Sequence, residues 1–315
     1  VGVKPTAGLV SRAGIVPLSP VQDTAGPMAA SVADAAVMLS VLAAADPADP
    51  AVPDRPAHSV ADYTGCLDLA ALEGARIGVW RGASIRADAA TKAVLDGAVH
   101  RLRALGARVT DPVDLPDVEK ITIPEFDALY YEFKYGINAY LACVAAQDGG
   151  APGLPGSLAD LIKFNELNAD QVLSRFGQEI FQFAEATSGD LTDPEYLELR
   201  GAATRLAVTS LEKPTAEHKL DAIVSLTANP AWLTDYVLGD HSVFGASRPA
   251  AVSGWPAISV PFGYVSGLPV GVSFVGPRWS EPRLLALAYA FEQATAARRS
   301  PGLLPTVRAG GGAPC

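Results

Sequence analysis

The chain has 315 residues, 49% of them hydrophobic, and a formal net charge of −10. This length and apolar content are typical of a well-buried globular protein and exclude an intrinsically disordered chain. The negative charge, without any run of basic residues, argues against binding to nucleic acids or anionic membranes, whose phosphates attract cations.

Cysteine and histidine indicate neither a disulfide scaffold nor a zinc site. Three scattered cysteines have no CxxC spacing, and the four histidines have no HExxH or HxxxH spacing. The chain also lacks an apolar run of membrane-spanning length and a signal-peptide pattern, so a cytoplasmic protein is expected. It begins with Val1, so any preceding signal would lie outside this sequence. A lysine-poor, alanine-rich composition suggests GC-rich coding, as in many bacteria.

The first third of the chain predicts a strand, a capped helix and a βαβ unit. Residues 1–30 are dense in Gly, Pro and Ser, which predicts a short strand and then an extended path. A capping box at 31–34 predicts the start of a helix. Strand-like residues 76–80, an amphipathic segment at 88–105 and a second strand at 107–110 then predict two parallel strands joined by a helix.

The middle of the chain, residues 120–213, predicts helices. It is rich in aromatic residues and contains a capping box at 157–160 and an Asp-Pro-Glu helix start at 193–195. We interpret 120–213 as a helical layer that shapes the substrate site. Its three tyrosines at helical spacing, Tyr130, Tyr131 and Tyr135, are expected to pack in the core.

The last third predicts three more strands, at 220–226, 257–261 and 270–275, with a turn-rich connection at 263–269. A final amphipathic helix is expected at 281–298, followed by a disordered Gly-rich tail at 309–315. The predicted fold class is α/β: a single α/β/α layered domain over residues 1–315 with a mixed, largely parallel sheet.

Two blocks of sequence at opposite ends of the chain resemble the amidase signature family, whose members are serine hydrolases that cleave C–N bonds. The first block is Val1-Gly2-Val3-Lys4-Pro5-Thr6 with Gln22-Asp23-Thr24-Ala25-Gly26-Pro27-Met28, and the second comprises residues 247–261, 267–276 and 280–295. The resemblance covers nearly the whole chain and is loosest at 112–215.

Shorter segments are similar to the peptide-amidase-like branch of that family. They are Phe176 to Phe181, Pro230 to Asp235 and Gly239 to His241. Thr227-Ala228-Asn229 departs from the branch, which more often has a Gly-containing turn there, so the pocket is expected to have its own shape at this point.

The resemblance implies a nucleophilic Ser, a second Ser held by a cis peptide bond, and a buried neutral Lys that acts as base. Backbone N–H groups of a glycine-rich loop would stabilise the oxyanion. The nucleophile would precede Val1 by about a dozen residues. By this correspondence the chain lacks the triad and the N-terminal strands, and the chain alone is expected to be inactive. Lys4 follows the nucleophile position, so a structural or surface role is expected for it, and Ser11 and Ser19 are interpreted as loop serines.

Two groups of residues remain as candidates for a role in the site. Gln22, Asp23 and Thr24 could brace the nucleophile loop or line the acyl pocket; alternatively, they form a polar turn that caps the next helix. Trp232 and Asp235 could supply a pocket wall and a polar contact to a substrate amide; alternatively, they are a packed Trp beside a solvated Asp.

The function implied is hydrolysis of a small or peptide-like carboxamide, without a metal or organic cofactor. The expected partners are that amide substrate and an N-terminal half supplied by the same gene or by a second chain. One alternative is an amidotransferase A subunit that feeds ammonia to a partner. A non-catalytic truncated remnant is the other.

Overall fold

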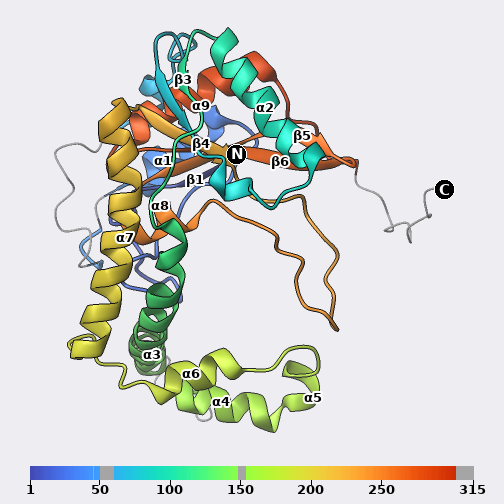
Figure 1. The fold of residues 1–315 in the computed structure, drawn as a ribbon. Coiled ribbons are helices and arrows are strands. Elements are labelled where there is room, and N and C mark those ends of the chain that lie inside the picture. The colour runs from blue at the N-terminus through green and yellow to red at the C-terminus, as the bar shows by residue number, and fades with distance from the viewer. Residues whose placement is uncertain (45, 50–59, 148–153, 303–315) are drawn as a thin grey trace, which may run out of the picture.

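The computed structural model describes residues 1–44, 46–49, 60–147 and 154–302, so the predicted tail at 309–315 lies outside the described residues. Within these described residues, six strands form one sheet in the order β1-β5-β6-β4-β2-β3 (Figure 1). The strands are β1 (Gly2–Lys4), β2 (Arg76–Val79), β3 (Arg108–Thr110), β4 (Ala222–Leu226), β5 (Ala257–Val265) and β6 (Leu268–Val275).

The sheet is mixed, as predicted. β2 pairs in parallel with β3 and β4, whereas β6 is antiparallel to both β4 and β5, and β1 is antiparallel to β5. These pairings make β2, β3, β4 and β5 point the same way, so most of the described strands share one direction. The predicted βαβ unit is confirmed, because α2 (Ala89–Ala104) joins the parallel strands β2 and β3.

Helices cover both faces of the sheet. On the first face, α1 (Val32–Leu42), α2 and α9 (Glu281–Thr295) bury the main core, in which Phe291 contacts the rings of Phe262 and Phe274. On the second face, α8 (Arg248–Ser253) and the C-terminal part of α7 (Pro194–His218) enclose a smaller core that includes Trp80, Leu211 and Ile223. The α/β/α layering follows from this arrangement.

Local sequence signals located the helix starts correctly. Ser31, Asp88, Ser157 and Asp193 each accept a hydrogen bond from a backbone N–H in the first turn of the following helix. A side-chain oxygen at this position satisfies one of the donors that a helix leaves unpaired at its start, which is why the sequence pattern is informative.

Two boundaries differ from the prediction. β5 and β6 extend to a two-residue turn at Ser266 and Gly267, so residues 263–269 are mostly strand instead of connection. Both turn residues have positive φ (50° and 83°), the geometry that matches the twist of a tight hairpin. The last helix ends at Thr295, because Ala296 takes the left-handed conformation.

The middle of the chain forms an arm and not a layer lying flat on the sheet. α3 (Thr122–Gln147) packs along α7, and both extend away from the sheet (Figure 1). The short helices α4 (Leu158–Leu167), α5 (Ala169–Val172) and α6 (Glu179–Ala186) lie at the far end. We call α3 to α6 and the N-terminal half of α7 the arm.

The three tyrosines of the arm have different surroundings. Tyr131 is buried, as predicted, and its hydroxyl donates to Glu195 at 2.8 Å, which raises the pKa of Tyr131 to about 12. Tyr130 is half-buried, with its ring centroid 5.8 Å from that of Phe183. Tyr135 is 51% exposed, so the prediction of core packing is wrong for this residue. Among the described helices none is long and apolar enough to cross a membrane.

Candidate functional site

A row of small and hydroxyl-bearing residues crosses the second face of the sheet. Gly2 on β1 lies opposite Ser259 on β5, Ser259 opposite Ser273 on β6, and Ser273 opposite Ser225 on β4. Side chains of paired residues stand on the same face of a sheet. Neighbours along each strand, such as Ile258 and Phe274, point into the main core, so the row lies on the opposite side.

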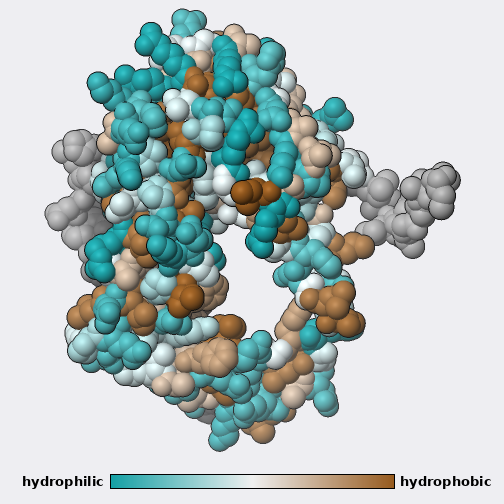
Figure 2. Space-filling model, in the orientation of Figure 1, coloured by the Kyte–Doolittle hydropathy of each residue, from teal (hydrophilic) through white to brown (hydrophobic). Residues whose placement is uncertain are grey.

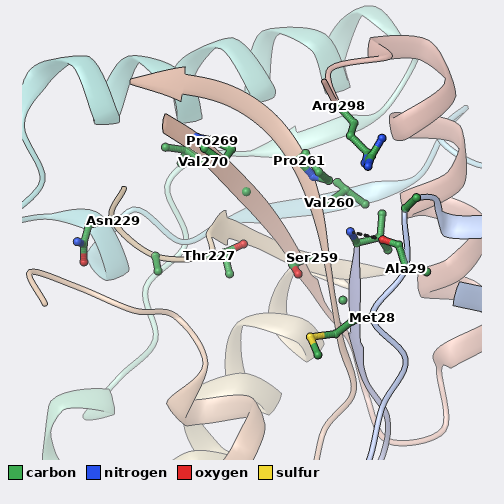
Figure 3. A pocket seen from close by; sticks show the side chains of 15 residues that line it. Met28, Ala29, Thr227, Asn229, Ser259, Val260, Pro261, Pro269, Val270 and Arg298 are labelled. Carbon is green, nitrogen blue, oxygen red and sulfur yellow. Dashed lines mark hydrogen bonds between the residues drawn. The ribbon is translucent and has the colours of Figure 1, made fainter. Parts of the chain in front are cut away.

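Two adjoining cavities open over this row. The smaller, of about 370 Å³, and the larger, of about 740 Å³, share Gly2, Met28, Thr227 and Ser259 in their walls. Figure 3 shows Thr227 and Ser259 in the middle of the larger cavity, between Asn229 at one end and Met28 at the other. Thr227 and Ser273 are joined by a hydroxyl–hydroxyl hydrogen bond of 2.8 Å.

Lys4 lies in the wall of the smaller cavity, a placement that was not predicted from the sequence. Its Nζ donates to Pro5 O at 2.9 Å. Burial lowers the pKa of Lys4 to about 8, since a desolvated ammonium is destabilised, while Glu281 opposes the shift and Arg278 adds to it. The Lys4 ammonium therefore loses its proton at a lower pH than an ordinary lysine does.

The candidate residues Gln22, Asp23 and Thr24 make three different sets of contacts. Thr24 lies in the wall of the smaller cavity. Asp23 Oδ2 accepts from the backbone N–H of Leu18 and of Ser19, both at 2.8 Å, and so closes the loop 18–23 upon itself. The alternative of a helix-capping turn is wrong, because the next helix is capped by Ser31.

Gln22 links this loop to the arm. Its Oε1 accepts from Arg200 Nη1 at 2.7 Å, and its Nε2 donates to Glu125 Oε1 at 3.2 Å. Glu125 Oε2 lies 2.8 Å from Arg248 Nε. The two groups form a close ion pair, but Oε2 accepts no hydrogen bond from the described residues. The loop that contributes Thr24 to the cavity is thereby held by side chains of α3, α7 and α8.

A buried ion pair lies behind this contact. Glu132 is fully buried and accepts two hydrogen bonds from Arg200, from Nε and Nη2, each of 2.7 Å. Tyr196 donates a third, of 2.8 Å, and the pKa of its hydroxyl is raised by burial and by the Glu132 carboxylate. The fork-shaped guanidinium thus satisfies one carboxylate and also holds Gln22.

The candidates Trp232 and Asp235 lie on a long loop, residues 229–245, outside the walls of the two cavities. Trp232 is 39% exposed and donates from Nε1 to Asp240 at 3.1 Å. Asp235 accepts from the backbone N–H groups of Leu238 and Val237, which lower the pKa of its carboxyl. These polar contacts lie within the loop and hold it in shape.

The base of this loop is part of the larger cavity. Thr227, Ala228 and Asn229, the segment whose sequence departs from the peptide-amidase-like branch, all lie in the cavity wall. Asn229 Oδ1 accepts from the backbone N–H of Val243 at 3.1 Å, and Ala228 forms an isolated β-bridge with Gly245. The turn that the sequence singled out therefore shapes the cavity.

The tip of the loop touches the arm and closes a ring. The ring of Tyr236 lies 5.7 Å from that of Phe176, and the Arg175 guanidinium lies 4.7 Å above Tyr236. Figure 2 shows the resulting opening, bordered by the sheet region, the arm and the loop. Apolar side chains are displayed along the loop, with Val237 90% exposed.

The serine row and Lys4 were not predicted as site residues. A usable signal was present: each of the strands 222–226, 257–261 and 270–275 contains one serine, at a position that faces away from its large apolar neighbours. Pairing those positions across the sheet requires the strand register, which the sequence alone does not provide. Among the described residues, no group of His, Cys, Asp and Glu is arranged to hold a metal ion.

Comparisons with known proteins identify relatives of the whole chain. The chain is 44% identical to a peptide amidase of Stenotrophomonas maltophilia of known structure, with a TM-score of 0.84 over 94% of this chain and 58% of that one. It is 37% identical to a probable amidase of Arabidopsis thaliana over 96% of this chain and 54% of the relative.

A third relative is the A subunit of the glutamyl-tRNA(Gln) amidotransferase of a Synechococcus strain, 29% identical over 99% of this chain and 60% of the relative. The chain thus spans little more than half the length of the curated relatives it matches. The model of the family described as amidase matches residues 1–285, and on this match the chain belongs to the amidase family.

Proposed function

We propose that this chain is part of an enzyme that hydrolyses a small or peptide-like carboxamide. The observation that carries the proposal is the 44% identity to a peptide amidase across nearly the whole chain, at a TM-score of 0.84. The hydroxyl-lined cavities on the second sheet face support it, because an uncharged amide needs hydrogen-bonding groups that fix its orientation.

The proposed chemistry is acyl transfer by a Ser–cis-Ser–Lys triad that this chain does not itself supply. A Ser would attack the amide carbon while the second Ser relays the proton of the nucleophile to a neutral Lys. The Lys would return this proton to the departing ammonia or amine, and water would then hydrolyse the acyl-enzyme. Lys4 is not assigned to this triad. The complete protein would combine these groups with the sheet face described above, through an N-terminal half from the same gene or from a second chain.

Within this proposal, the candidate residues position the reacting groups. Asp23 fixes the loop 18–23, Gln22 holds that loop against the arm, and Thr24 borders the cavity. Trp232 and Asp235 shape the loop 229–245, which with the arm would limit the size of the substrate.

A serine-directed probe tests the proposal. The chain alone is treated with a fluorophosphonate and assayed on C-terminal peptide amides, and the same is done with the protein encoded together with the sequence upstream of Val1. We expect labelling and turnover only for the longer protein. Robust labelling of the 315-residue chain by itself would contradict the assignment of the nucleophile to another segment.

Similarity to an amidotransferase A subunit supports a second candidate, a protein that releases ammonia for a partner enzyme. It is disfavoured by the lower identity to such subunits, 29% and 32% in two examples, and by the segment Pro230 to Asp235, which is similar to the stand-alone branch. This second candidate would be favoured if a tRNA-coupled reaction that stops without this protein were restored by added ammonia. A stop codon directly upstream of Val1 would instead favour a non-catalytic remnant.

A further inference from the structure

The smaller cavity has an unusual combination of wall groups. Among the described residues that line it, Lys4 is the one with a charged side chain, and none carries a carboxylate. The remaining polar side chains of the wall are all hydroxyls: Thr24, Thr227, Ser247, Ser259 and Ser273. A cavity wall that offers one cation and several hydroxyl donors, and that carries no carboxylate itself, matches a ligand with anionic oxygens.

The Lys4 ammonium has an incomplete set of partners for a buried charge. Its hydrogen bond is to a neutral acceptor, Pro5 O. The charged groups near it are Glu281, whose Oε1 accepts from the backbone N–H of Thr6 at 2.6 Å, and Arg278, whose like charge disfavours protonation of Lys4. Because burial is the largest influence on this group, an anion bound beside it would favour the charged form of Lys4.

The hydroxyls can supply the remaining hydrogen bonds. Thr227 and Ser273 share one hydrogen bond of 2.8 Å, which uses only one of their two hydroxyl protons and leaves the other to donate. Ser259 lies next to Ser273 in the cross-strand row and lines the same cavity. Hydrogen bonds from such donors to a carboxylate are stronger than those to a neutral group.

We propose that this cavity binds a small monocarboxylate, paired with Lys4 and hydrogen-bonded by the hydroxyls of Ser259, Ser273 and Thr227. A monoanion is favoured over a phosphate dianion, because a single buried cation compensates a single charge. The proposal does not rest on amide hydrolysis, since binding is measured without turnover.

Protection of Lys4 from chemical modification tests the proposal on the 315-residue chain. The chain is reductively methylated with and without propionate, with chloride at equal ionic strength as the control, and each lysine is followed by peptide mass spectrometry. We expect propionate to slow methylation of Lys4 and to leave Lys120 unchanged, because the side chain of Lys120 is 63% exposed. Equal rates at Lys4 with and without propionate would overturn the proposal.

The pH dependence of propionate affinity gives a second readout. The carboxylate binds the ammonium form, and a pKa of about 8 makes that form scarce at higher pH. Affinity should therefore fall about tenfold between pH 7 and pH 9, whereas pairing with an ordinary lysine would leave it nearly constant over this range. A constant affinity, or tighter binding of inorganic phosphate than of propionate, contradicts the assignment.

Variants complete the test. Lys4→Met should abolish propionate binding, and Lys4→Arg should retain it while removing its pH dependence. Lys120→Met is the matched control and should bind normally. Should Lys4→Met fail to fold, Ser259→Ala keeps the proposal testable, with an expected loss of about tenfold or more in affinity. If Ser259→Ala and Ser273→Ala both bind propionate normally, the carboxylate does not bind at these hydroxyls.

Discussion

Replacing Arg200 by Met should destabilise the chain strongly, because it leaves a buried carboxylate without its cation. Glu132 is fully buried and receives two hydrogen bonds of 2.7 Å from Arg200 and one of 2.8 Å from Tyr196. The variant retains only the bond from Tyr196. Removing one partner of a buried ion pair typically costs about 3–5 kcal/mol.

That cost is a large fraction of the stability of a typical domain, which is about 5–15 kcal/mol. The double variant Arg200→Met with Glu132→Leu should recover most of the loss, since no charge is then left unpaired. Arg205→Met is the matched control: Arg205 is exposed on the same helix, and its replacement should change stability by no more than about 0.5 kcal/mol.

Urea unfolding measures these differences with two probes. Far-UV circular dichroism reports mainly on the helices, and tryptophan fluorescence reports on the sheet and the loop, because none of the four tryptophans lies in the arm. If the arm unfolds separately, the two transitions of Arg200→Met will not coincide. A loss below about 1 kcal/mol by both probes would refute the reasoning, since that is the value of a surface ion pair.

Four further predictions concern single sites. Asp23→Ala in the complete protein should lower kcat more than it raises KM, while Asp23→Asn should retain activity. A normal kcat and a normal Tm in Asp23→Ala would show that Asp23 is only a surface turn residue. Between pH 8 and pH 10 Lys4 is protonated in the unfolded chain and neutral in the folded chain. The free energy of unfolding of the wild type, compared with that of Lys4→Met, should therefore rise with pH in urea titrations. Tyr236→Ala removes the contacts with the arm, including that with Arg175, and should speed deuterium exchange in residues 230–242 with less than about 1 kcal/mol of global destabilisation. Gly267→Ala should lower the stability measured by thermal unfolding by about 1 kcal/mol. The cost comes from the φ of 83° alone, because no atom of the described residues beyond the two chain neighbours lies within 4 Å of the added carbon.

The features that the sequence predicted well are local ones. Helix starts at Ser31 and Asp193, the βαβ unit and the α/β class depend on residues a few positions apart, whose preferences act before the chain is folded. Family resemblance placed both ends of the chain in one fold, and the comparisons confirmed it. The hairpin between β5 and β6 was predicted too short, because its strands continue into residues that also favour turns.

The features that were missed depend on contacts between distant residues. Gln22 meets Arg200 across 178 positions of sequence, and Ser259 meets Ser225 only through the intervening Ser273. Lys4 was assigned a structural or surface role because it follows the expected position of the nucleophile. That position in the sequence gives no information on whether the side chain is buried. Its position in a cavity wall becomes visible only when the strands are assembled.

The length of the arm has a mechanical consequence. α3 has 26 residues and is therefore about 39 Å long, so a tilt of about 5° at its base would displace its far end by about 3 Å. Among the described residues, an aromatic contact between the arm and the loop joins Phe176 and Tyr236, whose rings lie 5.7 Å apart, with the Arg175 guanidinium beside them. A small change in packing at the base of α3 would thus be magnified at the far end of the arm, which makes this contact.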